Sequence, residues 1–186
     1  MIRFIGDVHG KIDKLLPLVH PTATTIQVGD FGFGFVPIPE LPDNLFILRG
    51  NHDNPGLMAQ YPKTLTQSGV FYTDLKTLYY VAGAYSVDCM ERISGVSWWP
   101  DEQLGYIDLL DAIYYARRTE PDIIFTHDCP DFIYGHKSIT SSALTQLFDG
   151  WHPKLWVFGH HHQSFNQVIE NTRFVGLAEL EVFDVG

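Results

Sequence analysis

Five short apolar runs along the chain each end at a glycine or a polar residue, and this pattern constrains the fold more than any other feature of the sequence. The runs span residues 3–5, 25–28, 45–48, 122–126 and 155–158. Short apolar runs bounded by turn residues are typical of buried β-strands. In open α/β sheets, ligands bind in the crevice beyond the carboxyl ends of the strands. The pattern therefore predicts an α/β fold whose polar residues gather at that edge.

Apolar residues at helical spacing predict helices between these strands. We expect helices over residues 12–19, from Pro100 to Tyr114 and over residues 141–148. Strand-forming residues on both sides of turns predict two hairpins, one over residues 70–86 with breaks at 74–76 and 83, the other over residues 165–177 with a turn at 170–172. The chain thus gains a second, mixed or antiparallel sheet. We expect one domain, residues 1–186, built as a two-sheet sandwich flanked by helices.

The charge of the chain limits its partners. The formal net charge is −10, with 12 Lys and Arg residues against 22 Asp and Glu residues. Such an acidic chain is unsuited to holding long nucleic acid by counterion release. It is equally unsuited to phosphate anions, unless several of the acids bind divalent cations that reverse the local field. We therefore expect a small substrate and no long nucleic acid, while the oligomeric state stays open.

The sequence also bears on where the chain resides. No apolar run approaches the length of a membrane span. The strand expected at residues 3–5 leaves no room for a signal peptide. The two cysteines, Cys89 and Cys129, are too few for a disulfide framework and are expected to be buried thiols. These features favour a cytoplasmic protein without a membrane partner.

The residues that follow the five runs supply the candidate metal ligands. They are Asp7, His9, Asp30, Asn51, His127, His160 and His162. Glycines at 6, 29, 50 and 159 let the chain turn sharply and approach an ion closely. Imidazole, carboxylate and amide ligands without a thiolate cluster suit Mn²⁺, Fe or Zn²⁺. Seven ligands exceed one tetrahedral centre and suit two ions about 3.5–4 Å apart, which share a carboxylate and activate a bridging water as the hydroxide nucleophile.

The order of these motifs resembles the calcineurin-like metallophosphoesterase superfamily. The pattern of that superfamily is Asp-x-His, Gly-Asp, Gly-Asn-His-Asp/Glu, a lone His and Gly-His-x-His, and all five blocks are present between Asp7 and His162. Segments 82–88 and 97–100 also resemble small phage and bacterial members. The resemblance implies a metal-dependent phosphoesterase with a four-layer α/β/β/α sandwich of two mixed sheets.

The resemblance also implies a role for each ligand. One ion would be held by Asp7, His9, Asp30 and His162, and the other by Asp30, Asn51, His127 and His160. Asp30 then bridges the two ions and is itself a catalytic residue. His52 stays off the metals and acts as general acid to the leaving oxygen or stabilises the pentavalent transition state. We expect manganese as the native metal, although Fe and Zn²⁺ suit the same ligands.

One block departs from the pattern of the Ser/Thr protein phosphatases and diadenosine tetraphosphatases. There it continues as Gly-Asp-x-x-Asp-Arg-Gly, whereas Phe33 and Gly34 stand in place of the Asp-Arg pair here. The cations then on offer to a substrate are Arg49 and Lys137, and aromatic residues beside the metals could stack on a base. These features favour a phosphodiester or nucleotide substrate. Two alternatives stay open: a phosphomonoesterase resembling the protein phosphatases, and a non-catalytic scaffold like the retromer subunit of this fold.

Other polar residues have no settled place in the pattern. Arg49 would contact a substrate phosphate or form a structural ion pair, and Asp53 would brace His52 or a backbone turn. His161 would point away from its neighbours in an extended loop and is left out of the ligand set. Three histidines lack a motif and are expected to be structural or at the surface: His20, His136 and His152.

Overall fold

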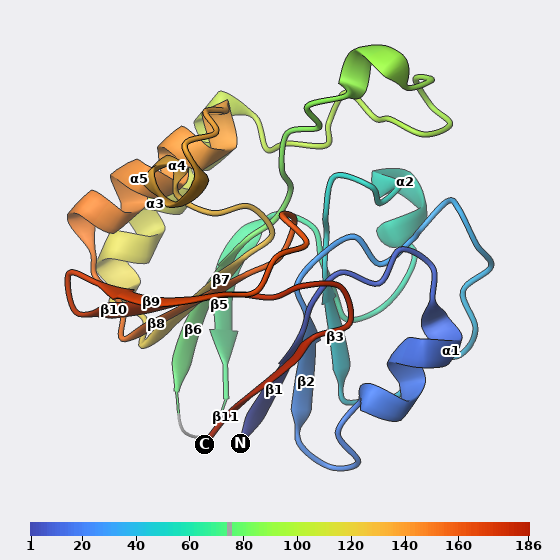
Figure 1. The fold of residues 1–186 in the computed structure, drawn as a ribbon, viewed down its shortest axis with the longest axis horizontal. Coiled ribbons are helices and arrows are strands. Elements are labelled where there is room, and N and C mark those ends of the chain that lie inside the picture. The colour runs from blue at the N-terminus through green and yellow to red at the C-terminus, as the bar shows by residue number, and fades with distance from the viewer. Residues whose placement is uncertain (74–75) are drawn as a thin grey trace.

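The computed structural model describes residues 1–73 and 76–186 and contains two β-sheets packed face to face (Figure 1). The first sheet has the strand order β11-β1-β2-β3-β4. Its strands are β1 (Ile2–Ile5), β2 (Thr24–Gln27), β3 (Leu45–Leu48), β4 (Thr64–Leu65) and β11 (Val182–Val185). The second sheet has the order β5-β6-β7-β8-β10-β9. Its strands are β5 (Ser68–Tyr72), β6 (Thr77–Val81), β7 (Ile123–Thr126), β8 (Leu155–Phe158), β9 (Phe165–Ile169) and β10 (Thr172–Gly176).

The inner strands of both sheets run parallel, and the antiparallel strands lie at the edges. In the first sheet β1 to β4 pair in parallel, and β11 joins β1 antiparallel. In the second sheet β6, β7, β8 and β10 pair in parallel, with β5 and β9 antiparallel at the two edges. Both sheets are therefore mixed. Because the carboxyl ends of parallel strands share one edge, the polar residues after β1, β2, β3, β7 and β8 can converge there.

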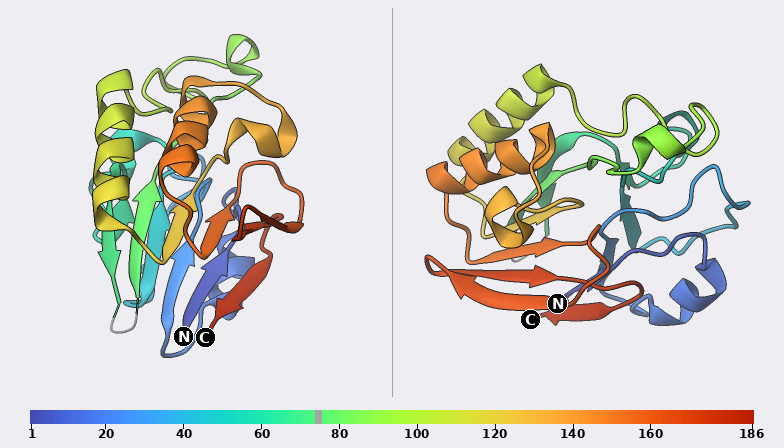
Figure 2. Two further views of the ribbon diagram at one scale, coloured as in Figure 1. Left: turned by 90° about the vertical axis from the view of Figure 1, so that its left-hand side faces the viewer. Right: turned by 45° about the horizontal axis from the view of Figure 1, so that its top comes forward.

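Helices connect the strands and cover the outer faces of the two sheets (Figures 1 and 2). They are α1 (Ile12–Leu15), the 3₁₀ turn η1 (Leu16–Leu18), α2 (Pro55–Met58), the 3₁₀ turn η2 (Cys89–Glu91), α3 (Tyr106–Thr119), α4 (Asp131–Tyr134) and α5 (Ile139–Gly150). A capping box between Ser138 and Ser141 fixes the start of α5. Across the described residues, no helix is long and apolar enough to cross a membrane.

Three buried apolar clusters lie between four layers of the molecule. The central cluster joins the two sheets, with Phe4 and Ile26 of the first packed against Phe125 and Val157 of the second. A second cluster lies between the second sheet and α3 and α5. The third lies between the first sheet and the α1 and α2 side. This is the α/β/β/α arrangement that the sequence resemblance implies.

The two expected hairpins are confirmed as β5-β6 and β9-β10. The break expected at residues 74–76 falls partly on residues 74–75, which lie outside the described residues. Strand β11 was not expected from the sequence. It pairs antiparallel with β1, Ile2 opposite Val185, and so closes the edge of the first sheet with the far end of the chain.

The helix expected from Pro100 begins only at Tyr106. The carbonyls of Asp101 and Glu102 accept hydrogen bonds from Nη1 of the buried Arg49 guanidinium, at 2.8 and 3.0 Å. These tertiary contacts hold residues 101–102 in a loop and override the local helix signals, which are weak in comparison.

The two cysteines are free, but only Cys129 is buried. Cys89 lies partly exposed in η2, within the loop of residues 82–105 that joins β6 to α3. Its neighbour Met90 is 92% exposed, because the tip of this loop extends away from both sheets (Figure 1). The expectation of two buried thiols is therefore wrong for Cys89.

Candidate metal centre

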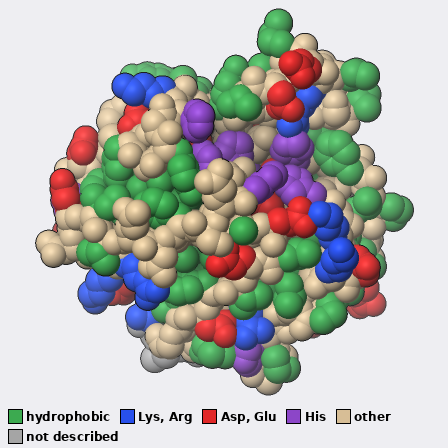
Figure 3. Space-filling model, in the orientation of Figure 1, with side chains coloured by type: hydrophobic (Ala, Val, Ile, Leu, Met, Phe, Trp, Pro, Cys, Tyr) green, Lys and Arg blue, Asp and Glu red, His purple; other side chains and the backbone are tan. Residues whose placement is uncertain are grey.

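The carboxyl ends of strands from both sheets meet at one place, and most of the histidines of the chain gather there. Figure 3 shows several of them in a single hollow of the surface. The backbone is strained at this point: φ is +49° at His9, +57° at Asp30, +67° at His160 and +52° at His162. Such left-handed conformations are costly for residues other than glycine and cluster at functional sites. The strand-end turns thus hold these side chains in place at a conformational cost.

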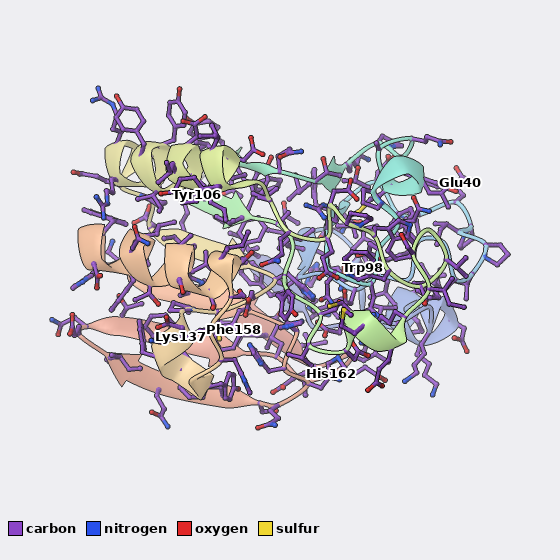
Figure 4. The ribbon with its side chains drawn as sticks, turned by 90° about the horizontal axis from the view of Figure 1, so that it is seen from above. Glu40, Trp98, Tyr106, Lys137, Phe158 and His162 are labelled. Atoms are coloured by element: carbon purple, nitrogen blue, oxygen red, sulfur yellow. The ribbon has the colours of Figure 1, made fainter. Side chains whose placement is uncertain are left out.

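The first group of candidate ligands comprises Asp7, His9, Asp30 and His162, whose ligand atoms all lie within 4.8 Å of one another. Nε2 of His162 lies 3.1 Å from Oδ2 of Asp7 and 2.9 Å from Nε2 of His9. Figure 4 shows this edge from above, with His162 labelled. Two carboxylates and two imidazoles facing one point match the ligand preferences of Mn²⁺, Fe and Zn²⁺.

The second group comprises Asp30, His127 and His160, again within 4.8 Å of one another. Asn51 joins this group, because its Oδ1 lies 2.9 Å from Nε2 of His127. Oδ1 of Asp30 lies 3.2 Å from the same nitrogen. Asp30 therefore belongs to both groups, which is the position expected of a bridging carboxylate.

The contacts of His127 test whether a cation fits this second group. Its Nδ1 lies 2.8 Å from the carbonyl of Val28 and donates to it, which leaves the Nε2 lone pair facing the oxygens of Asn51 and Asp30. Three electron-rich atoms facing one another are stable only around a cation or a proton. In the protein alone, burial disfavours the imidazolium, but the Asp30 charge outweighs burial and raises the pKa of His127 to about 10. A divalent ion would take the place of that proton.

The two carboxylates of the centre also fit a bound cation. Asp7 and Asp30 are 0% and 1% exposed, and among the described residues their ion-pair partners are histidines alone. Burial opposes ionisation of Asp30, yet the charge of His127 holds its pKa below the usual range. Burial lowers the pKa of His160 to about 4, so its imidazole stays neutral and able to bind a metal. Buried carboxylates need such compensation, and metal ions supply it.

Glycines let the backbone come this close to the carboxylates. A Cβ on Gly50 would lie 2.1 Å from Oδ1 of Asp30, and a Cβ on Gly159 would lie 2.4 Å from Oδ1 of Asp7. Both distances are far below van der Waals contact, so a side chain at either position would displace a candidate ligand. The predicted use of glycine for close approach therefore has a direct geometric reason at these two positions.

His52 lies next to the two groups but belongs to neither. Its backbone N–H donates to Oδ1 of Asp30 at 2.8 Å, and its ring stands edge-on to His9 with centroids 5.3 Å apart. Burial lowers the pKa of His52, the charge of Asp30 opposes that shift, and the charge of Arg92 adds to it. The imidazole lines a pocket of about 410 Å³ together with Asp30, Asn51 and His160.

Comparison with known proteins now adds to this geometry. The sequence profile of the calcineurin-like phosphoesterase family matches residues 1–164. The chain belongs to the calcineurin-like phosphoesterase family. No curated protein sequence shows significant similarity to it.

Solved structures are similar to the chain at low sequence identity. A Staphylococcus aureus protein, provisionally described as a 5′-nucleotidase, has a TM-score of 0.54 at 14% identity, covering 97% of this chain and 49% of that one. The chain therefore spans about half the length of that protein. A predicted phosphoesterase from Streptococcus pneumoniae gives 0.45 at 14% identity, covering 96% and 71%. An archaeal phosphodiesterase gives 0.44 at 11% identity, covering 96% and 83%.

This calcineurin-like phosphoesterase orients Asn51 through a chain of hydrogen bonds that the sequence did not reveal. Nδ2 of Asn51 donates to Oγ of Ser86 at 2.8 Å, and that hydroxyl donates to Oε2 of Glu102 at 2.5 Å. Ser86 and Glu102 are both 2% exposed. With its nitrogen committed to Ser86, the amide must present its oxygen to the metal group. Only the path of the loop of residues 82–105 brings these residues together.

Asp53 braces the backbone of this centre and does not contact the ring of His52. Its carboxylate accepts from the backbone N–H groups of Phe31, Gly32, Phe33 and Gly50, at 2.8 to 3.2 Å. Burial, together with the nearby Asp30, raises the pKa of Asp53, and these hydrogen bonds oppose the shift. Of the two roles that the sequence left open for Asp53, the backbone brace is the one observed.

Arg49 was predicted to contact a substrate phosphate or to form a structural ion pair, and its surroundings favour a structural role. The residue is 3% exposed and does not line the pocket. Besides the two carbonyls of the loop, its Nε donates to the carbonyl of Thr66 at 3.0 Å. With Nε and Nη1 engaged by three backbone carbonyls, Arg49 ties the loop of residues 82–105 to the first sheet.

The remaining histidines divide into structural and pocket residues. Nδ1 of His20 accepts from the backbone N–H of Thr22 and of Ala23, and His152 stacks on Phe148, so both are structural. His136 is exposed, as expected, and also lines the pocket. His161 was left out of the ligand set, and its Nε2 lies 3.3 Å from Oδ1 of Asp128.

Proposed function

We propose that the protein is a metal-dependent phosphoester hydrolase whose centre holds two divalent cations, with Mn²⁺ the first choice. Asp7, His9, Asp30 and His162 hold one ion, and Asp30, Asn51, His127 and His160 hold the other. The observation that carries the proposal is the pair of ligand groups joined at Asp30, in a chain of the calcineurin-like phosphoesterase family. The orientation of His127, whose Nε2 faces two oxygens, supports it further.

The residues around the cations divide the chemistry between them. The two cations, when bound, lower the pKa of a water molecule and neutralise charge on the phosphoryl group. Asp30 would serve both ions, and the hydrogen bond to Ser86 holds the amide of Asn51 in place. His52 lies outside the ligand groups, with its backbone fixed on Asp30 and its ring in the pocket. In the proposed reaction His52 donates the proton that the leaving oxygen requires.

The pocket favours a phosphodiester or a nucleotide as substrate. Among its described lining residues, Arg92 and Lys137 are the Lys and Arg side chains, while Tyr85 and Val87 offer apolar surface. A diester carries one negative charge at the reacting group, whereas a monoester carries up to two and needs more cationic contacts. Parallel assays with bis-p-nitrophenyl phosphate and p-nitrophenyl phosphate in Mn²⁺ test this preference. Hydrolysis of the monoester alone would favour the phosphomonoesterase alternative.

Metal content and turnover test the proposal as a whole. The purified protein should bind two equivalents of Mn²⁺ and hydrolyse at least one of the two phosphoesters, and chelation should abolish the activity. Protein that binds no metal and hydrolyses neither ester would point to the scaffold alternative. We further propose a cytoplasmic location, because Cys89 and Cys129 are free thiols.

A further inference from the structure

The Gly-Asp motif block, residues 29–35, places no Lys or Arg side chain in the pocket. Phe33 is 1% exposed and packs in the third apolar cluster. Gly34 has a φ of +95°, and a Cβ there would lie 2.9 Å from Cβ of Asn54. A long cationic side chain does not fit at either position. Any guanidinium that meets the substrate must therefore come from elsewhere in the chain.

Arg92 brings a guanidinium to the pocket from the loop of residues 82–105. The tip of that loop lies above the two sheets in Figure 1, and Figure 4 shows the loop from above. The side chain of Arg92 is 14% exposed and lines the pocket together with His52. Its Nη1 lies 3.0 Å from Nδ1 of His52, and its Nη2 lies 2.7 Å from Nε2 of the same ring. The fork of the guanidinium therefore faces the proposed general acid.

The contacts of Arg92 leave part of its hydrogen-bonding capacity unused. Its Nε donates to Oδ1 of Asp88 at 2.8 Å, and Nη1 makes a long contact of 3.5 Å to the carbonyl of Ser97. A neutral imidazole has one acceptor nitrogen, and the protonated form that acts as an acid has none, so His52 can satisfy at most one of the two Nη groups that face it. Asp88 thus fixes the guanidinium from one side, while N–H groups remain available on the pocket side.

We infer that Arg92 is a substrate-binding residue that donates to the non-bridging oxygens of the phosphoryl group, and that Asp88 orients it. A planar guanidinium matches the oxygens of a phosphoryl group in a bidentate geometry that an ammonium cannot reproduce. The inference rests on the proposed function, since it assigns a phosphoryl group to this pocket. It gives the pocket the cationic side chain that residues 29–35 lack.

Inorganic phosphate, as a competitive inhibitor of the Mn²⁺-loaded enzyme, tests the inference directly. R92A should raise the inhibition constant of phosphate and the KM of the hydrolysed ester by about 10–100-fold, the range expected for lost charge-assisted hydrogen bonds. R92K should recover only part of that loss, because lysine restores the charge without the fork. D88N should give a smaller increase in the same constants. R118A, which removes an exposed arginine of α3 that does not line the pocket, is the matched control.

A double variant separates substrate binding from an effect through His52. If Arg92 contacts the phosphoryl group, R92A should raise the phosphate inhibition constant by the same factor in wild-type and in H52A protein. If the increase disappears in the H52A background, Arg92 only positions His52 and the inference is wrong. An unchanged constant in both backgrounds would overturn it as well. Metal content and melting temperature are measured for every variant, and R92K replaces R92A in the comparison if R92A loses either.

Failure of the inference is distinguishable from failure of the proposed function. Wild-type protein that hydrolyses no phosphoester in Mn²⁺ contradicts the proposed function, whatever the variants do. In that case calorimetric titration of the Mn²⁺-loaded protein with inorganic phosphate still measures the contribution of Arg92, and equal affinities for wild type and R92A would reject it. Active wild-type enzyme with an unaffected R92A variant rejects only the assignment of Arg92.

Discussion

The strand-end turns and the loop of residues 82–105 both face the pocket, but they are built differently. The turns carry the candidate metal ligands on short, strained connections directly after buried strands, and Asp7 and Asp30 are almost fully buried. The loop carries Ser86 and Arg92, and its tip exposes large apolar side chains such as Met90. A buried frame for the proposed metals beside a projecting loop for the proposed substrate matches the usual division between scaffold and specificity.

This division predicts that changes in the strand-end turns affect the metals, whereas changes in the loop affect the substrate. Asp30 is the extreme case, because it belongs to both ligand groups. D30N should lose the charge that both ions share, bind less than one equivalent of Mn²⁺ and show no measurable turnover. Metal analysis and ester hydrolysis measure the two effects. A variant that retains two ions and wild-type turnover would place the centre elsewhere.

His52 tests the boundary between the two regions, since it follows β3 but faces the loop. H52N should keep both ions, because the imidazole lies outside the ligand groups, and should lose roughly 10²–10⁴-fold in kcat through the missing proton donor. The comparison of kcat with metal content distinguishes the roles. A parallel loss of metal would make His52 a ligand and not an acid.

The sequence was sufficient to predict the strand-end turns, because each turn and its candidate ligand follow from a few neighbouring residues. A ligand that follows a buried strand by one to four residues lies at the edge of the sheet wherever the neighbouring strands run parallel. Asp7, His127 and His160 could therefore be placed without knowledge of any loop. The same reasoning gave a two-sheet sandwich flanked by helices, because apolar runs and helical spacing fix which faces are buried. The four-layer arrangement came from the family resemblance.

The sequence was insufficient where tertiary contacts between distant segments decide the outcome. The sequence left Arg49 open between a phosphate contact and a structural ion pair, and only the fold shows that the carbonyls of residues 101–102 accept hydrogen bonds from its guanidinium. Arg92 stands in a segment without periodicity, so nothing local indicated that it would meet His52. Strand β11 pairs with β1 across nearly the whole length of the chain, and no local pattern announces such a partner.

Ser86 links the two regions, and its removal should give an intermediate effect. S86A leaves Nδ2 of Asn51 without its acceptor and Glu102 without its hydroxyl donor. The amide of Asn51 is then free to turn. The affinity for the Mn²⁺ ion held by the Asn51 group should fall about 10–100-fold, as is typical when the partner of a metal ligand is lost. Titration with Mn²⁺ measures this affinity, and the ion held by the Asp7 group should bind as in wild type. Equal weakening of both ions would contradict a specific link to Asn51.

Arg49 should have the smallest effect on catalysis, although it stabilises the fold. R49M leaves the carbonyls of Thr66, Asp101 and Glu102 without their buried donor, which should cost about 3 kcal/mol of unfolding free energy. For a chain of this size that corresponds to a melting temperature lower by about 6–12 °C. R3A is the control, because the Arg3–Asp184 pair is partly exposed and its loss should cost under about 1 kcal/mol. The folded R49M enzyme should keep the wild-type KM, since Arg49 does not line the pocket. A rise in KM as large as that expected for R92A would instead show that Arg49 contacts the substrate.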